Sequence, residues 1–158
     1  MARKYWLLKS DPATFGLSHL KKSPKQTTMW DGVRNYQARN YLRDGFDVGD
    51  RVLFYHSQIL PPAVVATATV VRAAYPDPTQ FDRRNPGFDP KSSKDAPRWV
   101  AVDIRLDQEL PRPVTLTEMR QVKGLGEMVL LRKGSRLSVQ PVTAAEWRIV
   151  NRLGSRNE

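Results

Sequence analysis

Apolar and polar residues alternate over several short segments, and this pattern predicts β-strands. The clearest case is 99–106, where every second residue from 100 onward is apolar, as expected for a strand with one buried face. Short apolar runs rich in β-branched and aromatic residues predict further strands at 5–9, 27–30, 51–56, 63–71 and 136–140. The sequence therefore predicts five or six short strands.

Helical spacing occurs only in short segments between these strands. Residues 17–22, 35–46 and 116–122 are helix candidates, and Thr143 followed by Glu146 has the spacing of a capping box that opens a last helix. The order of strands and helices lacks the βαβ rhythm of a doubly wound sheet. We therefore predict the fold class α+β, with a small β-barrel or curled sheet of five to six strands and short flanking helices.

One segment fits neither pattern. Residues 75–97 hold five prolines and many charged residues but no apolar periodicity, so we expect a long exposed loop there. The length of 158 residues suits one domain. We place that domain at residues 1–154, with 155–158 as a frayed tail.

Composition excludes several classes of site. The chain has no cysteine and two histidines, so disulfides, thiolate nucleophiles and cysteine-based zinc sites are ruled out, and we expect neither a metal nor a cofactor. No apolar run approaches the roughly 20 residues of a membrane-spanning helix, and the N-terminus does not resemble a signal peptide. We therefore expect an intracellular, cytoplasmic protein that does not interact with membranes.

The net charge suggests a polyanionic partner. Lys and Arg number 26 against 16 Asp and Glu, which gives a net charge of +10, and neutralising phosphates releases condensed counterions. Candidate phosphate contacts are Arg39, Arg43, Arg83 and Arg84. The alternative is that the positive charge only keeps a small protein in solution. Charge alone therefore points to nucleic acid without distinguishing DNA from RNA.

Three sequence clusters resemble the EVE domain family. They are YWLLKSDP at 5–12, WDGVRNYQARN at 30–40 and VGDRVLFYHS at 48–57, and RLSVQPVT at 136–143 fits the same family. The resemblance implies a PUA-like barrel with a pocket that receives a flipped, modified base. It also implies DNA or RNA carrying that base as the partner, and no chemistry performed on it.

The chain departs from the family pattern at two places. Asp11 stands where Glu is common, which is a mild change. Residues 62–66 read PAVVA where a glycine-flanked Gly-Ile-Val-Gly is usual. Because glycine allows a backbone to approach a ligand closely, we expect the second departure to affect which base is preferred.

Trp30 and Asn35 are the main candidates for base binding. A base that leaves its stack needs an aromatic face and fixed hydrogen-bonding groups along its edge. Trp30 would supply the face, and Asn35 carries both a carbonyl and an amide. Each has a structural alternative: Trp30 as a core residue, as we expect for Trp6, and Asn35 as a helix N-cap. Arg34, next to Asn35, is the third candidate from this cluster.

Two strand ends supply the other pocket candidates. Lys9 and Ser10 end the first strand, and Tyr55, His56 and Ser57 end the strand at 51–56. Alternation sends Tyr55 and Ser57 to one face and His56 to the other, so all three line one wall only if the strand bends. Four of them also have a structural alternative. Lys9 would lie in solvent, the hydroxyls of Ser10 and Ser57 would cap turns, and His56 would be a core residue hydrogen-bonded to the backbone.

A non-catalytic reader of a modified base is the leading hypothesis, and two alternatives stay open. Asp31 and His56 would form the acid/base pair of a nucleic-acid-processing enzyme if the fold brought them together. A module that binds a small metabolite or another protein would use the same aromatic pocket. The sequence leaves the oligomeric state undetermined.

Overall fold

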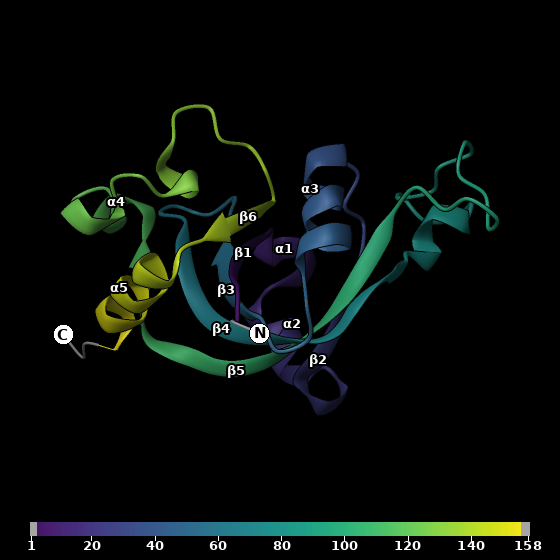
Figure 1. The fold of residues 1–158 in the computed structure, drawn as a ribbon. Helices are drawn as coiled ribbons and strands as arrows, with labels where there is room; N and C mark the ends of the chain where they lie inside the picture. Colours follow the sequence, from purple (N-terminus) through teal and green to yellow (C-terminus); the bar gives the residue numbers. More distant parts are fainter. Residues whose placement is uncertain (1–2, 156–158) are drawn as a thin grey trace.

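The computed structural model describes residues 3–155, which form one mixed sheet with short helices around it (Figure 1). The strands are β1 (Tyr5–Ser10), β2 (Thr27–Trp30), β3 (Arg51–His56), β4 (Ala63–Pro76), β5 (Val100–Thr115) and β6 (Val139–Val142). They pair in the order β2-β5-β4-β3-β1-β6. Neighbours run antiparallel except β1 and β3, which are parallel. The predicted α+β class and six strands are confirmed.

The sheet is curled but open, which corrects the prediction of a barrel. The pairing order ends at β2 and β6, and no hydrogen-bonded ladder joins these two strands within residues 3–155. Curvature comes from β4 and β5, which are 14 and 16 residues long and shift register at four places. Such irregularities bend strands, and Figure 1 shows both strands sweeping around the other elements.

The helices are short, as the sequence predicts. They are α1 (Pro12–Phe15), α2 (Leu17–Lys22), α3 (Tyr36–Asn40), α4 (Leu116–Met119) and α5 (Ala144–Gly154), with single turns η1 (Pro24–Gln26), η2 (Tyr41–Gly45), η3 (Pro78–Phe81), η4 (Lys123–Leu125) and η5 (Val129–Leu131). The capping box is confirmed, because Thr143 and Glu146 exchange hydrogen bonds of 2.9 and 3.1 Å. Ser155 caps the end of α5, and the rest of the predicted tail lies outside the described residues.

Two apolar clusters are separated by the alternation of β1 and β3. Leu8 and Phe54 pack in a cluster with Trp30, which we call the Trp30 cluster. Leu7, although next to Leu8, packs with Tyr55 in a second cluster, the Tyr55 cluster. Because successive side chains of a strand point to opposite faces, the two clusters lie on opposite faces of this part of the sheet.

Residues 77–99 form a lobe between β4 and β5 in which most residues are exposed or half-buried, as expected for a long exposed loop, but a few polar residues are buried. Asp77 and Gln80 are fully buried. The Gln80 amide donates to the carbonyls of Asp77 (2.7 Å) and Trp99 (2.8 Å), and its Oε1 accepts from the Trp99 N–H (3.1 Å). Buried polar side chains organise this lobe, and such residues leave no apolar periodicity in the sequence.

Candidate functional site

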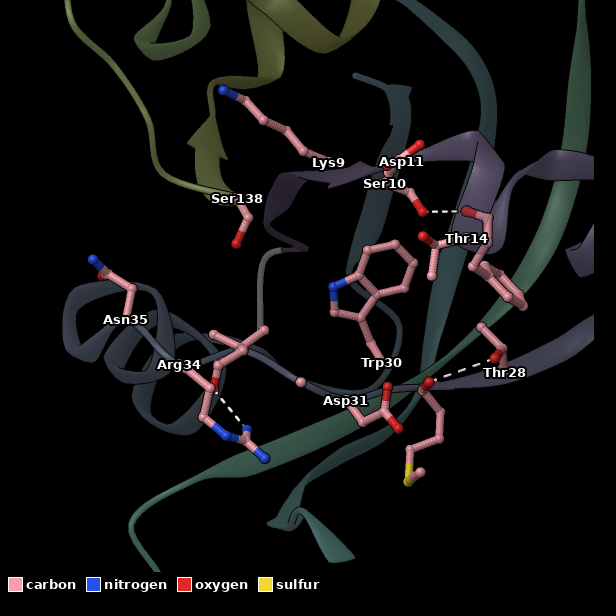
Figure 2. Close-up of a pocket in the computed structure, with 14 residues that line it drawn as sticks. Lys9, Ser10, Asp11, Thr14, Thr28, Trp30, Asp31, Arg34, Asn35 and Ser138 are labelled. Carbon is pink, nitrogen blue, oxygen red and sulfur yellow. Dashed lines mark hydrogen bonds between the residues drawn. The ribbon is translucent and has the colours of Figure 1, made fainter. Parts of the chain in front are cut away.

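A pocket of about 680 Å³ opens beside the end of β1. It is lined by residues 9–11 and 14–15 of β1 and α1, by residues 28–35, and by Ser138 (Figure 2). Its volume lies in the range of small-ligand sites and accommodates one nucleobase. The clusters at 5–12 and 30–40 therefore meet at the pocket, whereas the cluster at 48–57 contributes none of the lining residues.

Trp30 belongs to both the core and the pocket. It is 9% exposed and packs edge-on against Phe54, with ring centroids 5.8 Å apart. The same ring lines the pocket, and its Nε1–H has no hydrogen-bond partner among residues 3–155. Figure 2 shows the ring nitrogen turned toward the side of the pocket where Ser138 and Asn35 lie. Trp30 is thus a core residue that also lines the pocket, and its stacking on a base stays a prediction.

A buried carboxylate from the lobe holds the pocket wall at residues 31–35. Asp77 Oδ2 accepts hydrogen bonds from the backbone N–H of Gly32 (2.8 Å) and from Arg34 Nη1 (3.0 Å). Burial alone would raise the pKa of Asp77, but hydrogen bonds from Thr79, Gly32 and Arg34 outweigh burial and lower this pKa. Gly32 has a φ of 78°, a conformation that favours glycine, so the wall turns at this residue.

Arg34 lines the pocket, but its guanidinium is already bound. Besides the ion pair with Asp77, it donates to the carbonyl of Gly87 through Nε (3.0 Å) and Nη2 (2.7 Å) and to the Thr79 hydroxyl (2.9 Å). The guanidinium also lies 5.4 Å from the centroid of the Trp99 ring. Arg34 therefore joins the pocket wall to the lobe, and Asp77 neutralises its charge.

Asn35 is both the cap of a helix and a pocket residue. Its Oδ1 accepts the N–H of Ala38 (2.9 Å) and so caps α3. Its Nδ2 amide has no partner among the described residues. The amide donors are therefore available to a ligand, whereas the carbonyl oxygen already accepts one hydrogen bond from the helix.

Lys9 and Ser10 form the opposite side of the pocket. The Ser10 hydroxyl donates to the carbonyl of Phe15, which leaves its oxygen as an acceptor. The Lys9 backbone N–H donates to the Ser138 carbonyl (2.9 Å). The Lys9 ammonium lies 6.0 Å from the Tyr55 ring centroid and has no hydrogen bond or ion pair within residues 3–155. Burial lowers the pKa of Lys9.

Four polar pocket residues were not among the base-binding candidates from the sequence. They are Asp11, Thr14, Asp31 and Ser138. Asp31 is exposed, yet partial burial and the nearby charge of Asp77 raise the pKa of its carboxyl. The sequence suggests Asp31 only as an acid/base partner of His56, and Ser138 lies in the segment RLSVQPVT, which fits the family but was not assigned to the pocket.

The structure does not bring Tyr55, His56 and Ser57 to the pocket, contrary to the expectation from the sequence. Tyr55 is buried in the Tyr55 cluster. His56 Nε2 accepts the N–H of Leu17 (3.1 Å), and burial lowers the His56 pKa. Ser57 donates its N–H (2.9 Å) and its hydroxyl (3.3 Å) to the Ser10 carbonyl. The strand end keeps its alternation, so these side chains serve packing and the turn.

The four candidate phosphate contacts lie outside the pocket lining. Arg39 donates to the Arg98 carbonyl (2.9 Å), and Arg43 pairs with its neighbour Asp44. Arg83 and Arg84 are exposed on the lobe. Contact of these arginines with phosphates stays a prediction.

The segment 62–66 also lies away from the pocket lining. Ala63, Val64 and Ala66 are fully or almost fully buried in β4, and Pro62 accepts the Leu116 N–H (2.8 Å). The segment PAVVA therefore packs in and before β4 and is not part of the pocket lining. Their effect on base preference stays a prediction.

Two further features are absent from residues 3–155. No helix there is long and apolar enough to cross a membrane. That part of the chain also holds no group of three or more His, Asp or Glu side chains placed to bind a metal ion.

Comparison with known proteins agrees with the resemblance seen in the sequence. The EVE domain family matches residues 4–153. The chain belongs to the EVE domain family. Human thymocyte nuclear protein 1 is 40% identical to it over 163 residues, which cover 92% of this chain and 72% of that protein.

Solved structures of relatives share the fold over nearly the whole chain. A Pseudomonas putida protein is 44% identical, with a TM-score of 0.90, and the alignment covers 95% of this chain and 99% of that chain. The human THYN1 protein, in complex with DNA containing 5-methylcytosine, is 39% identical, with a TM-score of 0.91 and coverage of 98% and 99%. The open, curled sheet with its short helices is therefore a fold found in other family members.

Proposed function

We propose that this chain is a non-catalytic domain that binds a modified, flipped nucleobase of DNA or RNA in the pocket beside Trp30. The observation that carries the proposal is a pocket of about 680 Å³ in which the indole N–H of Trp30, the amide of Asn35 and the ammonium of Lys9 lack partners within the described residues. Trp30 is buried and Lys9 is half-buried, and donors in such places are normally paired, so these two groups indicate a polar ligand. The human relative bound to 5-methylcytosine DNA supports the class of partner.

Stacking and charge supply the binding free energy in this proposal. A base that leaves its stack loses contacts worth a few kcal/mol, and an aromatic side chain replaces roughly 1–3 kcal/mol of them. The net charge of +10 adds attraction for the phosphate backbone on either side. Such a partner is intracellular, in line with the cytoplasmic location expected from the sequence.

The arrangement of titratable groups supports binding without chemistry. Of the acid/base pair considered from the sequence, Asp31 lines the pocket and His56 does not. The Nε2 atom of His56 is occupied by the Leu17 N–H. A general base must reach the proton that it abstracts, and this pair does not converge on a substrate in the pocket.

The proposal is tested by measuring affinities for oligonucleotides that differ at one base. The panel holds cytosine, 5-methylcytosine, 5-hydroxymethylcytosine, adenine, N6-methyladenine and modified bases found in tRNA. We expect at least one modified base to bind about tenfold or more tightly than its unmodified parent, a difference typical of one extra small group held in a pocket. In Trp30→Ala this preference should fall to about twofold or less.

Two variants control for folding. Trp30→Phe keeps a ring in the core and should remain folded, with a smaller loss of preference than Trp30→Ala. Trp147→Ala removes a half-buried indole that packs against the Tyr55 cluster and should keep the full preference. Equal affinity of the wild-type chain for every modified base and its parent would overturn the proposal.

A further inference from the structure

Tyr36 presents an aromatic ring to solvent directly after a pocket residue. It follows Asn35, which lines the pocket, and begins α3. Tyr36 is 50% exposed, whereas the other aromatic residues within 3–155 are buried or half-buried. A single exposed aromatic residue needs no explanation by itself, so the surroundings of this ring decide what it can do.

The ring of Tyr36 belongs to a stack that begins at the pocket wall. It lies nearly parallel to the Trp99 ring, with centroids 4.8 Å apart and planes at 27°, which is a favourable aromatic arrangement. Trp99 is buried and donates its Nε1–H to Asp89 Oδ2 (2.7 Å), and the guanidinium of Arg34 lies 5.4 Å from its ring. The stack joins α3 to the lobe, and the two are neighbours in Figure 1. Tyr36 therefore has a fixed place beside the pocket before any partner binds.

One face of the Tyr36 ring is covered by neither of its neighbours. Trp99 covers the first face, and Arg39 Cζ lies 4.8 Å from the Tyr36 centroid and 6.0 Å from the Trp99 centroid. A guanidinium on the face opposite Trp99 would lie much farther than 6.0 Å from the Trp99 ring, because the two separations of 4.8 Å would then add. Arg39 therefore lies at the edge of the stack. With half of the residue exposed, the second face of Tyr36 is open to a partner.

Arg39 keeps a positive charge beside this open face. Its guanidinium donates to the Arg98 carbonyl (2.9 Å) and to the side-chain carbonyl of Asn40 (2.9 and 3.1 Å), and both acceptors are neutral. No carboxylate within residues 3–155 forms an ion pair with Arg39. A nucleotide offers both a flat ring and a phosphate, so it suits an aromatic face with a cation at its edge.

We propose that Tyr36 is a second stacking surface, which takes an unpaired base that neighbours the base held in the pocket. Stacking on an aromatic side chain tolerates any base, because every base has a π-face. A base inside a duplex has both faces covered by its neighbours, and unstacking it costs free energy. Tyr36 thus adds affinity for unpaired flanks without selecting a modification. This inference rests on the proposed function and extends it from the base in the pocket to the adjacent nucleotides.

The test uses single strands that carry the preferred modified base of the oligonucleotide panel. Each of the two nucleotides on either side is replaced in turn by an abasic site, which keeps the phosphates and removes one ring. We expect one replacement to weaken binding of the wild-type chain about fivefold or more, the lower end of the range for base–aromatic stacking. Tyr36→Ala should weaken binding of the intact strand by a similar factor. It should then lose no more than about twofold further at that position, because the contact is already gone.

Three comparisons separate stacking from other effects. Tyr36→Phe keeps the ring and should bind like the wild-type chain. Gln37→Ala changes an exposed residue of the same helix and should keep the sensitivity to the abasic site. Tyr36→Ala should keep the wild-type ratio of affinities for modified and unmodified base, because the pocket lining is unchanged, and urea titration checks that it remains folded.

The outcomes also separate this inference from the proposed function. If no abasic site weakens binding of the wild-type chain, or if the weakening is the same in Tyr36→Ala, Tyr36 does not stack on a flanking base, and the pocket keeps its proposed role. Tyr36→Phe binding as weakly as Tyr36→Ala would likewise overturn stacking, because the hydroxyl would then be the group that matters. Absence of any preference for a modified base in the wild-type chain overturns the proposed function and this inference with it.

Discussion

The two sides of the pocket are built in different ways. Residues 31–35 are fixed by a lobe far along the chain, because Asp77 binds Gly32 and Arg34 across 45 and 43 residues of sequence. The opposite side is the end of β1, held by main-chain pairing to neighbouring strands, and its Lys9 ammonium has no bonded partner in the described residues. Arg34 is neutralised by a buried carboxylate and therefore serves the fold. Lys9 has no such partner in residues 3–155 and is therefore available to a ligand.

The largest expected effect comes from removing the carboxylate that fixes the first side. Asp77→Ala leaves the Gly32 N–H without its acceptor and the half-buried Arg34 without its counter-charge. Breaking a buried pair in this way costs about 3 kcal/mol of unfolding free energy, which urea titration measures. Asp82→Ala, on the same lobe, removes an exposed carboxylate whose hydrogen bond is to the Arg84 N–H and should cost less than about 0.5 kcal/mol. Equal losses of unfolding free energy in Asp77→Ala and Asp82→Ala would show that Asp77 does not stabilise the pocket wall at residues 31–35.

A smaller effect, on affinity alone, is expected from the second side. Lys9→Gln should leave unfolding unchanged, weaken oligonucleotide binding several-fold at about 0.1 M salt, and reduce the slope of log affinity against log salt by about one. Arg34→Gln should do the reverse, with a loss of stability and an unchanged slope. If the slope of log affinity against log salt were reduced more by Arg34→Gln than by Lys9→Gln, the roles assigned to the two sides of the pocket would be wrong. A flat salt response of the wild-type chain would instead favour a neutral small ligand.

The sequence predicted the parts of the site that are local in the chain. Strand and helix periods placed Lys9, Trp30 and Asn35 at element ends, and these ends do meet at the pocket. Alternation also assigned Tyr55 and His56 to different faces, which the structure shows. Tyr55, His56 and Ser57 could line one wall together only if the end of β3 bent, and the structure keeps all three outside the pocket lining.

The remaining features depend on contacts that no local pattern records. Asp77 lies in a proline-rich segment without apolar periodicity, and its partners are distant in sequence. The opening of the sheet depends on register shifts between β4 and β5, which depend on cross-strand packing and not on the alternation of either strand alone. Asp31 was visible only as half of a catalytic pair, because its place in the pocket lining is a property of the folded chain.

The most direct test of the account is to observe the Trp30 indole N–H during binding, by ¹H–¹⁵N spectroscopy of the four tryptophan side chains. The Trp30 signal is the one absent from Trp30→Phe. The account predicts that this signal shifts most when the preferred modified oligonucleotide is added, while that of Trp6, which donates to Asp50 (3.0 Å), stays in place. Saturated binding with an unchanged Trp30 signal, or with the main shift at Trp147, would contradict the claim that this pocket holds the base.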